Sequence, residues 1–197
     1  MDPVVALALP IIRRSEGCFR RAKDGTLRAY ADSASALGRA IQRRGKWTQY
    51  LACTWEVPME LRELSGAPWT IGFGATGPDV TASTVWTQAQ ADQRLIEDTE
   101  ERARSVQQRA TRKLLHCEAA ALTSFLFNTG PGRFGVKDGL FELKGARRPS
   151  TLWVKAMAGA TSAVVLEFAK WTGAQGKKMP GLVTRRKAEA DLYRGRP

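Results

Sequence analysis

Cysteine and histidine are scarce in this sequence of 197 residues. The three cysteines, Cys18, Cys53 and Cys117, are odd in number and widely spaced, which is typical neither of a disulfide framework nor of a zinc site. We therefore expect three thiols, in a chain made in a reducing compartment. The single histidine, His116, has no partner motif, so it is interpreted as structural. Its isolation argues against Ser-His-Asp chemistry and against a histidine-rich zinc site, and we expect no metal ion and no cofactor.

The sequence also lacks an obvious targeting or membrane-spanning segment. Its N-terminal apolar run, MDPVVALALPII, has no basic residue before it and is followed by Arg13 and Arg14, which is the reverse of the charge order of a secretory signal. The run is much shorter than a membrane span. We interpret it as the start of a core helix, and export of the chain would then need outside help.

Acidic residues are few relative to basic ones, with 19 Asp and Glu against 31 Lys and Arg, a formal net charge of +12. Such a surface attracts polyanions: nucleic acid, anionic lipid, lipopolysaccharide or an acidic cell-wall polymer. The charge alone does not choose among them. Hydrophobic residues make up 43% of the chain, which supports a substantial core and argues against wholesale disorder.

The N-terminal part of the chain predicts one helix and two short strands. Residues 3–15 form the helix, and Gly17 ends it, so Glu16 lies at its C-terminal end. A long excursion separates the strands and contains a short basic helix with a serine cap, followed by an irregular stretch. The strands, expected to pair with each other, are residues 27–30 and 69–74, and the excursion is residues 33–68.

The rest of the chain is predicted to be helical. Thr87 and Gln90 have the spacing of a capping box and begin a long polar helix that runs to about Arg109. Arg185, Arg186 and Lys187 are interpreted as a solvated face of the last helix. The further helices are expected at residues 118–128, 150–158, 161–172 and 181–194.

These elements predict an α+β, mostly helical fold in a single domain, residues 1–197. A small lobe comprises about residues 16–80, and a helical lobe comprises about residues 81–197 together with helix 3–15. A cleft between the lobes is the expected place for a long substrate. The spacing of Gly72, Gly74 and Gly77 imitates a dinucleotide fingerprint, but no sustained helix follows it, so a nucleotide site is not predicted.

Glu16 is the first candidate catalytic residue. A carboxyl partly buried at a helix end, beside Cys18 and Phe19, would have a raised pKa and could stay protonated near neutral pH. A general acid for glycoside cleavage requires that property. Taken alone, however, a glutamate at a helix end is more often a solvated surface residue.

Five segments, in order along the chain, resemble motifs of the phage lysozymes of glycoside hydrolase family 24. Together they cover most of the chain outside the excursion, and their shared order makes the resemblance specific. The segments are SEGC at 15–18, AYAD at 29–32, WTIGFGAT at 69–76, SFLFNTG at 124–130, and FAKW at 168–171 followed by GLVTRRKAE at 181–189.

The resemblance implies a lysozyme-like fold and three catalytic residues. Glu16 would protonate the leaving oxygen, Asp32 would stay ionised beside the transition state, and Thr70 would position a water, as in an inverting glycosidase. Glu118 stands where many relatives carry glutamine and could contact sugar or be a surface residue. Phe127 could be a sugar platform but is more simply core, and Asn128 could bind an acetamido group or cap its own helix. The substrate-binding residues that the resemblance implies are Tyr30, Glu118, Phe127 and Asn128.

The spacing departs from the family pattern. Glu16 and Asp32 are sixteen positions apart, and 38 positions separate Asp32 from Thr70, both more than is usual in the family. The assignment of Asp32 therefore depends on the local Tyr-x-Asp match. Other acids that could be the second carboxylate are Asp24, Glu56, Glu60 and Glu63.

The expected function is hydrolysis of the β-1,4 bond between N-acetylmuramic acid and N-acetylglucosamine in peptidoglycan. The resemblance implies a monomeric phage endolysin, made in the host cytoplasm and released to the wall at lysis with a holin as functional partner. Attraction to an anionic envelope is a further expectation. The alternatives are a lytic transglycosylase of the same fold, a basic protein that binds nucleic acid, and a membrane-active protein whose C-terminal helix permeabilises; that helix lacks a wide apolar face.

Overall fold

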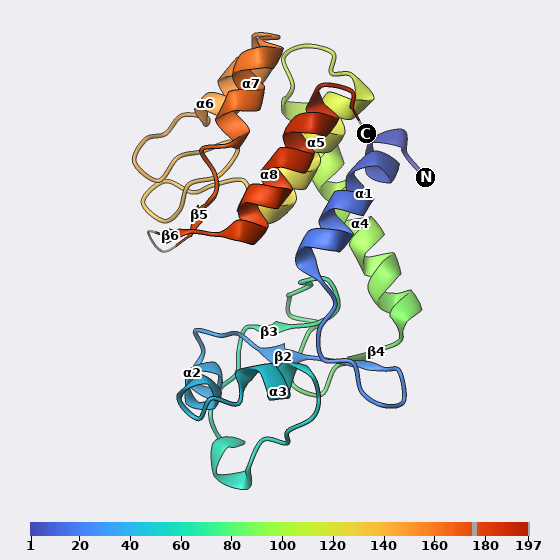
Figure 1. Cartoon of the computed structure of the whole chain (residues 1–197), viewed down its shortest axis with the longest axis vertical. Coiled ribbons are helices and arrows are strands. Elements are labelled where there is room, and N and C mark those ends of the chain that lie inside the picture. Colours follow the sequence, from blue (N-terminus) through green and yellow to red (C-terminus); the bar gives the residue numbers. More distant parts are fainter. Residues whose placement is uncertain (175–176, 197) are drawn as a thin grey trace. The chain divides into compact units, whose positions relative to one another are not determined.

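The computed structural model describes residues 1–174 and 177–196, which divide into two compact units (Figure 1). Unit 1 joins the two ends of the chain, Met1–Ser15 and Ile96–Pro197. Unit 2 is the continuous segment Glu16–Leu95. No helix within the described residues has both the length and the apolar character that a membrane crossing requires.

Unit 1 is helical, and its central element is α5, in which every residue from Glu118 to Leu126 is buried. A helix that is buried on all sides needs neighbours around it. Helix α8 lies along α5, and α7 packs against both α6 and α8 (Figure 1). The helices are α1 (Pro3–Glu16), the later part of α4 (Gln88–Arg109), α5 (His116–Thr129), α6 (Thr151–Met157), α7 (Thr161–Phe168) and α8 (Pro180–Tyr193).

Aromatic rings fill the core between these helices. Phe125 meets Phe168 edge to face at 5.7 Å and Trp171 at 5.1 Å, and Phe168 meets Tyr193 at 6.1 Å. Such pairs stabilise a core beyond the area that they bury. Near Trp171 the chain forms a small antiparallel pair that the sequence did not indicate, β5 (Gly173–Ala174) with β6 (Lys177–Lys178).

The interpretation of Arg185 and Arg186 as a solvated face of the last helix was wrong. Both are buried in unit 1, with 3% and 2% of their surfaces exposed. They surround the carboxylate of Glu189, which is also buried, and Ser124 donates a hydrogen bond of 2.8 Å to the same carboxylate. A pair of buried cations is tolerated here because a buried anion neutralises part of their charge.

Unit 2 contains two short antiparallel strand pairs. β2 (Tyr30–Ala31) pairs with β3 (Trp69–Thr70), which confirms the expected pairing across the excursion. β1 (Leu27–Arg28) pairs with β4 (Val85–Trp86), a strand that the sequence did not indicate. The prediction that the strand from residue 69 continues to residue 74 was wrong, because β3 ends at Thr70.

The chain turns after Thr70 because two glycines adopt positive φ. Gly72 has φ 61° and Gly74 has φ 87°, a backbone conformation that cannot continue a strand. Ile71 and Ala75 close the turn by exchanging N–H to carbonyl hydrogen bonds of 2.9 and 3.0 Å. The glycine-rich stretch is therefore a tight turn that follows a very short strand.

The excursion is a folded part of unit 2. Helix α2 (Ala36–Arg43) has the expected serine cap, in which the Gly38 N–H donates to Ser35 Oγ at 2.9 Å. The stretch that follows was predicted to be irregular, but it contains α3 (Trp47–Leu51) and a 3₁₀ turn (Met59–Leu61). The residues of the buried cluster that these elements share with β2 are Ala31, Leu37, Ala40, Ile41, Tyr50 and Leu61.

Tyr50 ties the excursion to the strand pair. Its ring is buried, and its hydroxyl accepts a hydrogen bond of 2.9 Å from the Ala31 N–H of β2.

The predicted capping box of α4 is also confirmed. The Thr87 N–H donates to Gln90 Oε1 at 2.7 Å, and the Gln90 N–H donates to Thr87 Oγ1 at 3.2 Å.

Candidate active site

Glu16 is the last residue of α1, and Gly17, with φ 67°, ends the helix directly after it. The Glu16 carboxylate reaches the exposed glycine of the 71–75 turn, since a Cβ placed on Gly74 would stand 3.6 Å from Glu16 Oε2. With no side chain on Gly74, this side of the carboxylate stays open. The turn after β3 therefore positions bare backbone beside the candidate acid.

Asp32, Tyr30 and Thr70 share one face of the β2–β3 pair. Tyr30 lies directly opposite Thr70, and residues opposite each other in an antiparallel pair point to the same face. Asp32 is two positions beyond Tyr30 and so returns to that face. The Asp32 N–H donates to Gly66 O and Pro68 O at 3.0 and 3.2 Å, which extends the pairing past β2.

The Asp32 carboxylate is fixed by its own chain. Oδ1 accepts a hydrogen bond of 2.6 Å from the Ala34 N–H, two residues on, as in an Asx turn. The same turn brings the Ser35 N–H to Asp32 O at 3.0 Å, one residue before α2 begins. The beginning of the excursion thus holds Asp32 in place beside the strand pair.

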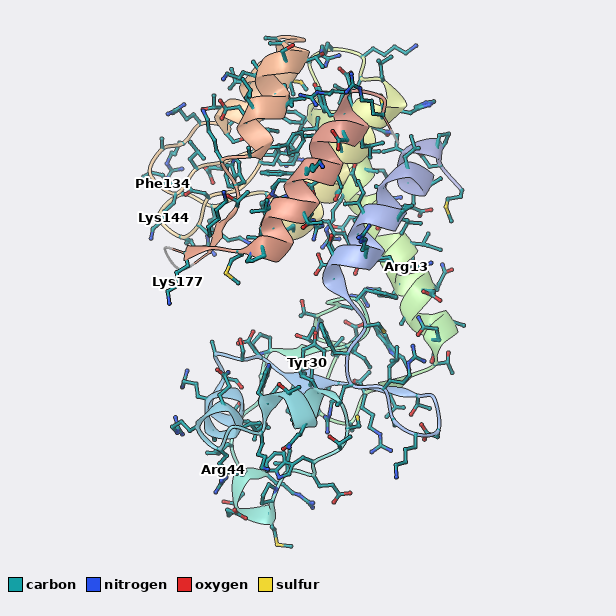
Figure 2. All side chains as sticks on the ribbon, viewed as in Figure 1. Arg13, Tyr30, Arg44, Phe134, Lys144 and Lys177 are labelled. Atoms are coloured by element: carbon teal, nitrogen blue, oxygen red, sulfur yellow. The ribbon has the colours of Figure 1, made fainter. Side chains whose placement is uncertain are left out.

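Tyr30, labelled in Figure 2, lies on β2 within electrostatic reach of both candidate carboxylates. Burial raises the pKa of its hydroxyl to about 12, and the nearby charges of Glu16, the Cys18 thiol and Asp32 add to the effect. Nearby negative charges disfavour a phenolate, so the hydroxyl keeps its proton. Within unit 2, the fold thus brings Glu16, Tyr30, Asp32 and Thr70 into one group, although they span more than fifty positions of the sequence.

The other acids that could be the second carboxylate are differently placed. Asp24 accepts hydrogen bonds from the Thr26 N–H and hydroxyl at 2.9 and 2.6 Å, and these lower the pKa of its carboxyl. Glu60 lies in the 3₁₀ turn and pairs with Arg44 at 3.2 Å. Glu56 and Glu63 are exposed in the excursion.

Glu118 is neither exposed nor directed to a ligand surface. Its side chain is buried, with 5% of the residue exposed, and Arg112 binds both carboxylate oxygens at 2.8 and 2.9 Å. The Leu115 N–H donates to the same carboxylate at 2.9 Å, at the first turn of α5. The idea of a surface glutamate was wrong, and the carboxylate has a structural role because it caps α5.

The pH dependence of stability should reveal this role. Burial alone would raise the pKa of Glu118, but hydrogen bonds from Arg112 and Leu115 together with the Arg112 charge lower it below its usual range. A lowered pKa means that the carboxylate stabilises the fold above the unfolded-state pKa of about 4.3, and that this stability is lost as the pH falls through the folded-state pKa. We expect Glu118→Gln to lower the free energy of unfolding at pH 7 by about 1.5–3 kcal/mol.

Urea unfolding of both proteins at pH 7 and pH 3 measures the effect. The difference in the free energy of unfolding between wild type and Glu118→Gln should be smaller at pH 3 than at pH 7. Glu100→Gln is the control, because Glu100 is 38% exposed and pairs with Arg104 at 4.0 Å, so it should show little difference at either pH. If the difference in unfolding free energy for Glu118→Gln were the same at pH 3 as at pH 7, the ionised Glu118 carboxylate would not have the proposed structural role.

Phe127 and Asn128 line a hollow of about 360 Å³ on unit 1. The Arg102 guanidinium lies 4.5 Å from the centre of the half-buried Phe127 ring. Asn128 Oδ1 accepts a hydrogen bond from Arg186, so among the described residues its side chain does not cap its own helix. These two arginine partners could not be anticipated from the sequence, since each comes from a distant part of the chain. The other residues around the hollow are Glu101, Arg102, Ser105, Leu126, Gly130, Pro131 and Lys137.

Metal ligands are not gathered anywhere in residues 1–174 and 177–196, where no group of three or more His, Cys, Asp or Glu side chains could hold an ion. The three cysteines, all within that part of the chain, are free thiols, as expected.

Comparison with known proteins gives matches over most of the chain. The family model of phage lysozymes matches residues 59–189, a span that includes Thr70 and begins after Glu16 and Asp32. A SAR-endolysin of Bacteriophage PS119 is 30% identical over 123 residues, which are 62% of this chain and 66% of that protein. An endolysin of Bacillus phage PZA is 31% identical over 125 residues, which are 64% of this chain and 43% of that protein. The chain thus matches about two thirds of the first relative and less than half of the second.

A solved structure of an endolysin from Escherichia coli O157:H7 phage FAHEc1 has a similar fold. It superposes with a TM-score of 0.58 over 95% of this chain and 90% of that chain, at 24% sequence identity. At this identity the likeness concerns the fold alone, and it confirms the α+β, mostly helical, lysozyme-like fold.

Proposed function

Because this chain belongs to the phage lysozyme family, we propose that it is a muramidase that hydrolyses the β-1,4 bond between N-acetylmuramic acid and N-acetylglucosamine in peptidoglycan. The observation that carries the proposal is the pairing of β2 with β3, which places Thr70 opposite Tyr30 and on the same face as Asp32. The long excursion, residues 33–68, connects β2 to β3 and does not interrupt their pairing. The names of the relatives, endolysins of phages, support the same function.

In the proposed mechanism Glu16 is the general acid. It donates its proton to the glycosidic oxygen as the bond to the sugar C1 breaks, so that the leaving sugar departs as an alcohol. Asp32 is ionised when the bond to C1 breaks and stabilises the positive charge that develops there. Thr70 holds the water that attacks C1 from the opposite face, and the proton that this water loses passes to Asp32. Such a sequence inverts the configuration at C1.

Neighbouring groups act on the two proposed catalytic carboxylates. The Ala34 N–H fixes Asp32 Oδ1, and the Tyr30 hydroxyl, whose pKa burial and the charges of Glu16 and Asp32 raise to about 12, keeps its proton. Gly74 leaves the Glu16 side of the site open for a sugar ring. We include Tyr30, Phe127 and Asn128 as sugar contacts, and leave out Glu118 because Arg112 and Leu115 engage its carboxylate.

The wider proposal is that the two units act as one catalytic domain in a monomeric endolysin. It would be made in the host cytoplasm and reach the wall at lysis, with a holin opening the way. Its formal net charge of +12 would favour approach to the anionic wall.

The products of digestion test the reaction. Purified peptidoglycan is digested with the full chain, and the fragments are identified by mass spectrometry. A hydrolase adds water and leaves reducing muramic acid ends, and this is the expected result. A transglycosylase would instead leave 1,6-anhydromuramic ends. The absence of any cleavage, combined with binding of nucleic acid in a gel-shift assay, would overturn the proposal.

A pair of variants tests the second carboxylate. We expect Asp32→Ala to lower the rate of release of reducing ends about 100-fold, because charge stabilisation at a transition state is worth that much or more. Glu60→Ala should change the rate less than about two-fold, since Glu60 lies in the 3₁₀ turn and pairs with Arg44. A larger loss of activity in Glu60→Ala than in Asp32→Ala would assign the role of second carboxylate to Glu60.

A further inference from the structure

The loop between α5 and α6, residues 131–149, exposes apolar side chains on a fixed backbone. Phe134 is 43% exposed and Val136 is 56% exposed. The backbone around them is tied down, since the Arg133 and Lys137 backbones bond to each other at 2.9 and 3.0 Å and the Gly135 N–H donates to Lys144 O at 2.9 Å. We call this segment the basic loop.

The basic loop also carries more cations than anions. Its acids are Asp138 and Glu142, and both are used inside the loop. The Lys144 N–H donates to Asp138 Oδ1 at 2.7 Å, and the Phe134 N–H donates to Glu142 Oε2 at 2.9 Å. None of the loop's cations forms an ion pair with the residues that the structure describes, and all five are exposed. These cations are Arg133, Lys137, Lys144, Arg147 and Arg148.

Cations and apolar groups are combined within the same few residues. The Arg147 guanidinium lies 4.9 Å from the centre of the Phe134 ring, and Lys144 bonds through its backbone to the residue after Phe134. Figure 2 shows the Phe134 and Lys144 side chains extending outward from this loop, away from the helices of unit 1. A partly exposed aromatic ring beside a guanidinium group, in a loop that carries further cations, can meet both an apolar and an anionic partner.

We propose that the basic loop docks the protein on an anionic phospholipid bilayer. A polyanion such as nucleic acid or a wall polymer would use the cations but offers no apolar interior for Val136 and Phe134. A bilayer with anionic headgroups offers both, since phosphates meet the cations while the ring and the valine enter the acyl boundary. The loop is a short surface segment, so it holds the protein to one face of the membrane. This docking is separate from the proposed wall hydrolysis.

Sedimentation with vesicles tests the docking. Full-length protein is mixed with vesicles of phosphatidylcholine that contain phosphatidylglycerol, or of phosphatidylcholine alone. We expect binding only to the first, and weaker binding at higher salt. Each cation near an anionic surface strengthens binding about five-fold, so Lys144→Ala with Arg148→Ala should weaken it about 25-fold. Phe134→Ser with Val136→Ser should weaken it about ten-fold or more.

Matched variants elsewhere on unit 1 are the controls. Lys113→Ala with Lys187→Ala removes two exposed cations, and Val154→Ser with Leu166→Ser removes side chains that are 51% and 68% exposed. These pairs should bind vesicles nearly as the wild type does. All variants should also retain the wild-type rate of reducing-end release from purified peptidoglycan, which separates a failure of docking from a failure of the proposed function.

Three outcomes would overturn the docking proposal. The wild-type protein could fail to bind phosphatidylglycerol vesicles at low salt. The Phe134→Ser, Val136→Ser protein could bind them as well as the wild type does, which would make the partner any polyanion. Finally, the control pairs could weaken binding as much as the loop variants do, which would assign the effect to the net charge of the whole protein.

Discussion

Glu16→Gln should reduce the rate of peptidoglycan hydrolysis by about 1,000-fold or more. Glutamine has nearly the same shape as glutamic acid but no acidic proton, so the leaving oxygen would depart without protonation. General acid catalysis contributes about 10²–10⁴ to a rate. The substitution fits the space beside Gly74, where even an added Cβ would stand 3.6 Å from Glu16 Oε2. The loss should therefore appear in the turnover number, with the fold intact.

Release of reducing ends from purified peptidoglycan measures the effect, and the midpoint of thermal unfolding shows whether the variant is folded. Glu63→Gln is the matched control, since Glu63 is an exposed glutamate of the excursion and should retain full activity. If Glu16→Gln kept more than about a tenth of the wild-type rate, Glu16 would not be the general acid.

Glu189→Ala should lower the free energy of unfolding by about 3–5 kcal/mol, the cost of removing one partner of a buried ion pair. The Glu189 side chain is fully buried, and its two oxygens bind Arg185 Nε at 3.1 Å and Arg186 Nη1. Removal of the Glu189 carboxylate would leave the two buried guanidinium groups without the anion that neutralises part of their charge. It would also take the acceptor from the Ser124 hydroxyl, which donates to Glu189 Oε1 at 2.8 Å.

Urea unfolding at pH 7 checks this prediction, and the same helix provides a control. Asp191 is 38% exposed and pairs with Arg194 at 3.7 Å, so Asp191→Ala should cost less than about 1 kcal/mol. Equal losses from the two variants would show that the buried charges contribute no more to stability than an exposed pair. Because Arg186 also donates to Asn128, the Glu189→Ala protein should in addition be altered at the hollow on unit 1.

Local signals predicted the elements that depend on neighbouring residues. The reciprocal bonds of Thr87 and Gln90 follow from their spacing alone, and the serine cap of α2 needs only Ser35 and Gly38. The end of α1 at Gly17 placed Glu16 correctly for the same reason. The pairing of the two strands was predicted as well, from the strand-like stretches on either side of the excursion.

Features set by distant residues could not be predicted in this way. Glu118 is held by Arg112, and Arg112 also donates to the Tyr193 hydroxyl at 3.2 Å, from the far end of the sequence. Strand β4 has only two residues, too few for a pattern to be visible. The helical spacing of Arg185 and Arg186 before Glu189 could have signalled an ion pair, but not that α5 would bury it.

The discontinuity of unit 1 affects the order in which the protein can fold during synthesis. Unit 2 is one continuous segment, Glu16–Leu95, so it and all three candidate catalytic residues are complete when the ribosome has passed residue 95. Helix α1, with Val4, Val5 and Ile12 buried, belongs to unit 1 and must wait for the segment that begins at Ile96 before its packing can be completed. At about 5–20 residues per second, that wait lasts roughly 5 to 20 s. Throughout it, the apolar side chains of α1 lack the rest of unit 1, so the nascent chain carries an exposed apolar helix.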